Sequence, residues 1–248
     1  MQLCLILRLE APLVAFGDIM VDAIGPVSDL PSASMLTGLI GNALGWRREE
    51  KDRLQRLQDR LIYAARLDRR TLRITEFQTA ELDKNDEGWT TRGRPEGRAG
   101  GDGTYAGPHI RYREYDCDVS VVAALRLAPA GEYPDLETIA HALVEPFRPL
   151  FIGRKSCLPA APIFERLAEA DTLLQALRTV PLAAERKGQE RRVLVELPYE
   201  ERPPDGERFL AVHRCDRRDW RAGVHAGDTL RWSGFLSRTV FVDEAATR

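Results

Sequence analysis

Lysine is scarce in this chain of 248 residues: only four of its 36 basic residues are lysines, and the other 32 are arginines. Arginine offers phosphate a planar fork of donors and offers bases a flat face for stacking. A codon bias toward arginine explains the same count equally well. The formal net charge of −2 excludes a globally basic nucleic-acid-binding protein, but it leaves room for a local basic surface.

Long hydrophobic runs are also missing. None approaches the ~18 residues of a membrane-spanning helix, so we expect no membrane partner. The start, Gln2-Leu-Cys-Leu-Ile-Leu7, lacks a charged leader and predicts a first strand rather than a secretion signal. The four cysteines form no Cys-x-x-Cys pair, which argues against a zinc site and indicates reduced thiols in a cytoplasmic protein.

Motifs of catalysis are lacking as well. Gly153-Arg-Lys-Ser lacks the first glycine and the spacing of a phosphate-binding loop, and no Gly-x-Ser-x-Gly elbow occurs. RNA cleavage needs a general base and a general acid that both reach a 2′-hydroxyl of the RNA. His109 with Tyr105 or Tyr112 is the only pair that could supply them, and the support for it is weak. Asp116 and Asp118 share a strand face, where ion pairing with arginines is a commoner role than metal binding. We therefore predict no catalytic residue, metal site or cofactor.

The most informative stretch that is present is Phe147-Arg-Pro-Leu-Phe-Ile-Gly-Arg-Lys-Ser-Cys157. An apolar segment runs into a turn in which two cations and a hydroxyl sit beside a glycine that bends freely. We predict that Arg154, Lys155 and Ser156 bind the phosphates of a nucleic acid. The alternative is a strand that ends in an ordinary solvated basic turn.

A helix is predicted from about Met35 to Trp46, with Ser32 or Ser34 as its cap. Its apolar side chains fill one half-turn, and Gly38, Gly41 and Gly45 fall on the opposite side. Each glycine costs a helix about 1 kcal/mol against alanine, so the stripe needs an explanation. We favour close approach by RNA or a neighbouring protein, for which Gly41→Leu would leave the fold nearly intact. A packing groove for the same chain is the alternative.

The segment from Gly88 to Gly107 has seven glycines and cannot form its own core. We predict a long excursion between two strands, on which Trp89, Arg92, Arg94 and Tyr105 shape or stack RNA. In the following strand, His109 to Leu127, the odd positions begin with His109, Arg111 and Arg113. One strand face is therefore basic and then apolar, as single-stranded nucleic acid requires.

The remaining elements complete an α+β pattern. Strands and helices are predicted at residues 2–9, 49–61, 62–67, 72–79, 134–144, 171–179 and 192–197, with aromatic segments around Trp220 and Trp232–Val242. This order fits a split βαβ, or ferredoxin-like (RRM-like), domain. We assign residues 1–150 to that domain, with a protruding hairpin thumb at about 78–109. Residues 151–248 form the basic turn and a smaller C-terminal β-rich part.

These features together resemble the CasD family, the subunit of type I-E CRISPR Cascade complexes that holds the 5′ handle of the guide RNA. The resemblance lies in four segments in order. They are Leu9-Glu-Ala-Pro-Leu-Val-Ala-Phe-Gly17, the glycine-striped Leu30–Gly45, Arg113-Glu-Tyr-Asp-Cys-Asp118, and Gly153-Arg-Lys-Ser-Cys157 followed by Pro162-Ile-Phe164.

The resemblance implies a non-catalytic subunit that caps the crRNA 5′ handle and assembles with CasC backbone subunits and the large subunit CasA. It would meet target DNA only indirectly, through the complex, in antiviral defence. Related type I-C subunits cleave repeat RNA without metal, using a tyrosine, lysine and histidine set. The alternative function is therefore a metal-independent endoribonuclease, although no Lys-His pair occurs in this chain.

Overall fold

The computed structural model describes residues 1–20, 22–81, 86–87, 107–184 and 192–241. The longer elements are β1 (Gln2–Val14), α1 (Ala33–Ala43), α2 (Lys51–Arg60), β3 (Leu61–Arg69), β4 (Leu72–Ala80), β5 (His109–Leu127), α3 (Leu136–Val144), β6 (Phe164–Ala170), α4 (Leu173–Arg178), β7 (Arg192–Pro198), β8 (Phe209–Arg214) and β11 (Thr229–Ser237). The short ones are β2 (Ile24–Gly25), β9 (Arg218–Asp219), β10 (Val224–His225) and a 3₁₀ turn at Arg238–Val240.

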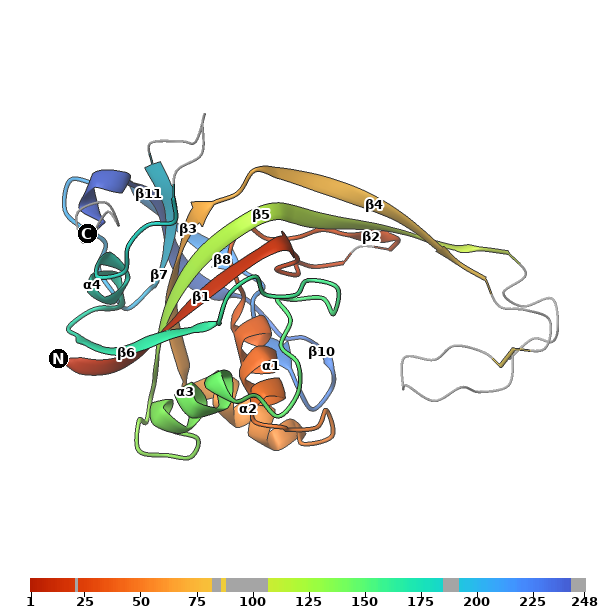
Figure 1. The fold of residues 1–248 in the computed structure, drawn as a ribbon, viewed down its shortest axis with the longest axis horizontal. Coiled ribbons are helices and arrows are strands. Elements are labelled where there is room, and N and C mark those ends of the chain that lie inside the picture. Colours follow the sequence, from red (N-terminus) through yellow and green to blue (C-terminus); the bar gives the residue numbers. More distant parts are fainter. Residues whose placement is uncertain (21, 82–85, 88–106, 185–191, 242–248) are drawn as a thin grey trace.

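One large sheet forms the centre of the molecule, with its main strands in the order β6-β1-β5-β3-β7-β11-β8 (Figure 1). Almost all pairings are antiparallel, and only the short β2 runs parallel to β5. Strands β6 and β7 lie beyond residue 150, yet they pair with β1 and β3. The proposed N-terminal and C-terminal parts therefore share one sheet.

Both faces of the sheet are covered, because side chains alternate along each strand. On β1, Leu5, Leu7 and Leu9 face the core beneath α1, α2 and α3. Cys4 and Ile6 face the second core, beneath α4. Figure 1 shows these three helices together on one face and α4 on the other. This two-sided burial accounts for the near-continuous apolar start of the sequence.

Strand β5 continues out of this core into a two-stranded arm, which we define as β4 together with residues 109–117 of β5. The arm is paired from Ala80 opposite His109 to Leu72 opposite Cys117. It projects from the sheet on the side where α1 and β10 lie (Figure 1). The two predicted strands are therefore paired and match their predicted ranges closely, whereas most of the predicted thumb at 78–109 lies outside the described residues.

Helix α1 begins where the sequence indicates. Ser32 is the N-cap, and its hydroxyl accepts from the backbone N–H of Met35 at 3.1 Å. Leu36, Leu39 and Ile40 are buried against the sheet, as the apolar half-turn predicted. The helix ends at Ala43 rather than near Trp46.

Several arginines are internal parts of the fold. The Arg66 side chain is fully buried, pairs with Asp68 at 2.7 Å and donates to the carbonyls of Val180 and Pro181. Arg60 likewise donates to the carbonyls of Pro129 and Pro134. These guanidinium groups satisfy loop carbonyls that the interior would otherwise leave without donors. In the part of the chain that the structure describes, no helix is long and apolar enough to cross a membrane.

Candidate nucleic-acid interface

The basic turn, residues 153–156, is held against the end of β1. Gly153 has φ +89°, and a Cβ at this position would lie 1.8 Å from the carbonyl oxygen of Ala15. The backbone N–H of Cys157 donates to the carbonyl of Arg154 at 2.9 Å, which closes the turn. Lys155 and Ser156 are exposed at its tip. The segment that leads into the turn is not a strand, so the strand that formed part of the alternative interpretation is absent there.

Arg154 joins the basic turn to the arm. Its guanidinium donates to the carbonyls of Glu114 at 2.6 Å and Gly25 at 3.2 Å, and it stacks 4.7 Å from the ring centre of Tyr115. Because these donors are used within the protein, the main role of Arg154 is to hold the basic turn against the arm. Phosphate binding by Lys155 and Ser156 stays a prediction, as does any contact of Arg154 with a phosphate.

The basic residues predicted on β5 share one face of the arm, whereas Arg73 of β4 lies on the other face beside Asp116. Arg111 and Arg113 alternate with residues of the opposite face and share theirs with Tyr115, the ring on which Arg154 stacks. Arg113 is exposed and lies opposite Glu76, and Arg111 lies opposite Gln78. His109 follows on the same face at the start of β5. Arg154 and the predicted cations of the arm therefore lie along one line.

The base of the arm is fastened by ion pairs. Arg73 contacts Asp116 at 2.8 Å, and its second nitrogen contacts Asp29 at 2.8 Å. Asp118 pairs with Arg69 at 3.3 Å. The two aspartates thus pair with arginines, the role weighed above as commoner than metal binding. The hydrogen bond from Arg73 to Asp116 is the main cause that raises the pKa of the Arg73 guanidinium.

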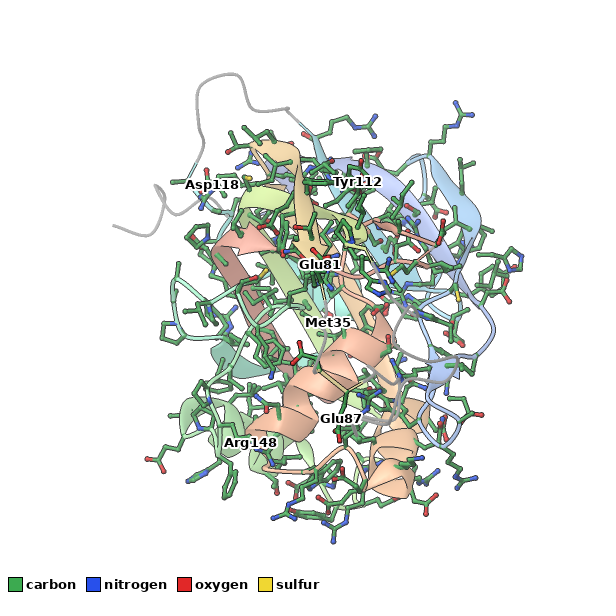
Figure 2. All side chains as sticks on the ribbon, turned by 90° about the vertical axis from the view of Figure 1, so that its right-hand side faces the viewer. Met35, Glu81, Glu87, Tyr112, Asp118 and Arg148 are labelled. Atoms are coloured by element: carbon green, nitrogen blue, oxygen red, sulfur yellow. The ribbon has the colours of Figure 1, made fainter. Side chains whose placement is uncertain are left out.

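A groove follows the exposed side of α1, and we call it the α1 groove. It consists of two depressions of about 350 and 860 Å³ that share Gly38, Asn42, Phe151 and Trp220 in their walls. The larger one is lined by four cations and one carboxylate: Arg47, Arg48, Arg148, Lys155 and Glu49. In Figure 2, which looks onto this side, Met35 marks the helix and Arg148 lies near its far end. An anionic polymer fits such a lining.

Segments of the same chain hold the walls of the groove. Trp220 donates from its ring nitrogen to Gln58 at 3.2 Å, and its backbone N–H donates to Gln55 at 3.0 Å, so α2 fixes the indole. Arg148 donates to the carbonyls of Gly45 at 2.7 Å and Trp46 at 3.0 Å. It therefore satisfies two carbonyls of the loop that follows α1, beyond the helix end at Ala43.

The interpretation of the glycine stripe as bare needs correction. A Cβ at Gly41 would lie 2.7 Å from Cδ2 of Leu54, and one at Gly45 would lie 2.7 Å from Cγ of Phe147. These two glycines therefore admit helix α2 and the segment after α3, which is the packing alternative. The expectation that Gly41→Leu leaves the fold intact is accordingly wrong. Among the described residues, only Trp220 lies near a Cβ placed at Gly38, at 3.6 Å, and Gly38 lines both depressions.

Four predicted thumb residues, Trp89, Arg92, Arg94 and Tyr105, lie outside the described residues. Sequence reasoning missed three groove residues, Trp220, Arg148 and Asn42. A signal for Trp220 was present, because arginines surround it in Arg217-Arg-Asp-Trp-Arg221. Arg148 and Asn42 meet only through the fold, where the side chain of Asn42 donates to the carbonyl of Pro149 at 2.9 Å.

The sheet, its arm and the basic groove belong to a known class of protein. A model of the family described as CRISPR-associated protein (Cas5) matches residues 4–229, and the chain belongs to this family. The CRISPR system Cascade subunit CasD of Escherichia coli (strain K12) is 29% identical over 178 residues, which cover 71% of this chain and 76% of that protein. The family predicted from the four motifs is thereby confirmed.

Two solved structures share the fold. A chain of a CRISPR RNA-guided surveillance complex has a TM-score of 0.66 at 22% identity, covering 96% of this chain and 93% of that one. A crystal structure of a Cas protein has a TM-score of 0.59 at 23% identity, with coverages of 97% and 98%. The common architecture is a mixed α/β fold with a mostly antiparallel sheet and few helices.

Proposed function

We propose that this chain is a non-catalytic subunit of a type I-E Cascade surveillance complex, where it binds and caps the 5′ handle of the crRNA. In this role it assembles with CasC backbone subunits and the large subunit CasA, and it meets target DNA only through the complex. Family membership and the similarity to a Cascade subunit support the setting.

One observation carries the RNA-binding role: the basic turn lies between the α1 groove and the basic face of the arm. Lys155 lines the groove, while the neighbouring Arg154 stacks beneath that face on Tyr115. Cations therefore occur on both sides of the turn, and the indole of Trp220 offers a flat surface on which an RNA base can stack. Charge together with stacking is what binds single-stranded RNA.

We also propose that the strands β1, β3, β5 and β6 form the ferredoxin-like, RRM-like unit of the N-terminal part. Their order in the sheet, β6-β1-β5-β3, with helices between β1 and β3 and between β5 and β6, supports this proposal. On the division expected above, residues 151–248 would then contribute the fourth strand of this unit as well as the smaller β-rich part.

The test uses the purified chain and end-labelled CRISPR repeat RNA in EDTA. Retention of intact RNA, with weaker binding for Lys155→Glu than for the wild type, is the expected result. Arg202→Glu is the matched control, because Arg202 is an exposed surface cation paired only locally with Asp205 at 3.0 Å. A cleaved product would instead establish the metal-independent endoribonuclease.

A second measurement locates the contact within the assembled complex. Photo-crosslinking of a guide RNA substituted in its 5′ handle should label peptides that contain residues 153–157 or 109–113. Crosslinks confined to other subunits would refute handle binding by this chain. Assembly with the other subunits that is unaffected by Lys155→Glu, with no crosslink, would indicate a purely protein-binding role.

A further inference from the structure

A second cavity, of about 340 Å³, lies on the other side of the start of α1. We call it the acidic pocket. Its walls come from residues 17–19 and 28–32, from Tyr63 on β3 and from the end of β8. The carboxylates in its lining are those of Asp18, Glu196, Asp216 and Asp228. Its charge is thus opposite to that of the adjoining α1 groove.

Asp216 is the deepest of these groups, with only 4% of its surface exposed. Its Oδ2 accepts a hydrogen bond from the hydroxyl of Tyr63 at 2.9 Å. Its Oδ1 is buried and accepts none from the part of the chain that the structure describes. A buried carboxylate oxygen without a donor is costly, and because Asp216 belongs to the lining, this acceptor lies in or just behind the wall of the pocket.

Negative charge converges on this pocket. Cys215 lies in its lining, and burial followed by the charges of Asp18, Asp216 and Asp228 raises the pKa of its thiol. The lining also contains one arginine, Arg214, which is engaged with Glu196, since its Nε donates to that carboxylate at 2.9 Å. At the rim, Asp228 contacts Nδ1 of His213 at 2.5 Å, and both side chains are more than half exposed.

We propose that the acidic pocket binds the guanidinium group of an arginine side chain presented by another protein chain. A guanidinium supplies several planar N–H donors, so it can satisfy Oδ1 of Asp216 and still reach the rim carboxylates of Asp18 or Asp228. An RNA backbone is repelled by the same charges. Within the described residues no three such groups converge as ligands of a metal ion.

This inference goes beyond the proposed function, because it concerns a protein contact and a different cavity. It would stand if the chain bound no RNA at all. It also assigns opposite partners to the two sides of α1, with an anionic polymer along the groove and a cationic side chain in the pocket.

The test is a titration of the isolated, isotope-labelled chain with N-acetyl-arginine amide, followed by NMR. We expect saturable shifts of the backbone amides of residues 28–30, 32 and 213–216. The uncharged analogue N-acetyl-citrulline amide should bind at least about tenfold more weakly, as should arginine amide to Asp216→Asn. Asp205→Asn, which removes an exposed carboxylate elsewhere, should leave the affinity unchanged.

Several results would overturn the proposal. They are no shift with arginine amide, equal shifts with citrulline amide, or shifts of these amides by magnesium ions or repeat RNA in its place. If Asp216→Asn fails to fold, Asp228→Asn at the exposed rim serves as the second variant, with a measurable loss of affinity expected. Unchanged arginine binding by that variant would then refute the proposal.

Discussion

Gly153 illustrates how much one residue can determine. Its backbone lies in the left-handed region, and the carbonyl oxygen of Ala15 occupies the space that a Cβ would need. Both conditions make any residue with a Cβ costly at this position. Because the turn follows directly, the directions of Lys155 and Ser156 depend on this packing.

We predict that Gly153→Ala lowers the free energy of unfolding by roughly 2–5 kcal/mol. The left-handed conformation accounts for about 1–2 kcal/mol and the clash with Ala15 for about 1–3 kcal/mol. Gly206→Ala is the matched control, because Gly206 has φ +81° and open space around it. Urea unfolding of both variants is the measurement, and equal losses would contradict the role of Ala15.

The arginines show what residue types alone cannot reveal. From composition alone, the excess of arginine could be explained by phosphate binding or by codon bias. Neither explanation covers Arg66, whose buried side chain donates to loop carbonyls more than 100 positions away in sequence. Arg148 and Arg154 are similar, since both donate to backbone carbonyls. Sequence identified the cationic segments, but the partner of each guanidinium depends on tertiary contacts.

At the scale of elements, the glycines of α1 determine how closely α2 approaches. Gly41→Ala should destabilise the protein by about 1–2 kcal/mol, because overpacking against Leu54 outweighs the gain in helix propensity. Gly38→Ala, with its nearest neighbour at 3.6 Å, should be neutral or stabilising by up to about 1 kcal/mol. Thermal and urea unfolding measure both.

Measuring Gly41→Ala in a Leu54→Ala background tests whether the contact with Leu54 causes the loss of stability. If the contact with Leu54 is responsible, the cost of Gly41→Ala disappears there, since its clashing atom is gone. A cost that persists would mean that another part of α1 resists the new methyl group.

Helix α3 carries a pH-dependent cap. The Oδ1 of Asp135 accepts from the backbone N–H of Thr138 at 2.8 Å, and hydrogen bonding to Thr138 lowers the pKa of the carboxyl below its ordinary 3.8. A lowered pKa stabilises the fold above pH 3.8, and this contribution is lost as the pH falls through the folded value. We predict that Asp135→Ala is less stable than the wild type at neutral pH.

The difference between wild type and Asp135→Ala should shrink when unfolding is measured between pH 5 and pH 2.5. Asp135→Asn is the control, because asparagine caps a helix without titrating. Its own cap contribution should stay constant over this range. A difference between the wild type and Asp135→Ala that does not change with pH would exclude the ionised carboxylate as its source.

Elements with strong local patterns were predictable, and long-range pairings were not. The alternation of residues 109–127 gave β5 its bounds, and the predicted cap Ser32 marked the start of α1. Strands β6 and β8 were missed, because their half-exposed residues show no clear period and their pairing partners lie far away in sequence. For the same reason the glycine stripe could be recognised in the sequence, but its packing against Leu54 and Phe147 could not be predicted.

At the scale of the whole molecule, a net charge of −2 coexists with strong local charge of both signs. The α1 groove collects cations, and the acidic pocket beside it collects carboxylates. Nucleic-acid binding should therefore reflect the local surface and not the total charge.

Lys155→Gln should weaken binding of repeat RNA and lower the slope of log affinity against log salt by about 0.7 to 1, the release of one counterion. Arg202→Gln changes the total charge equally at a site outside the groove and should leave the slope unchanged. Fluorescence anisotropy at several salt concentrations measures both. Equal effects of the two substitutions would mean that total charge governs binding.

Strand β5 has a mechanical consequence. Its first half belongs to the arm, and its second half lies in the middle of the sheet between β1 and β3. Asp118, with φ +50°, interrupts the regular strand geometry between the two halves. Residues 120–125 are paired with β1 on one edge and with β3 on the other, so the sheet fixes where the arm starts, and Asp118 is the point at which its direction departs from the twist of the sheet.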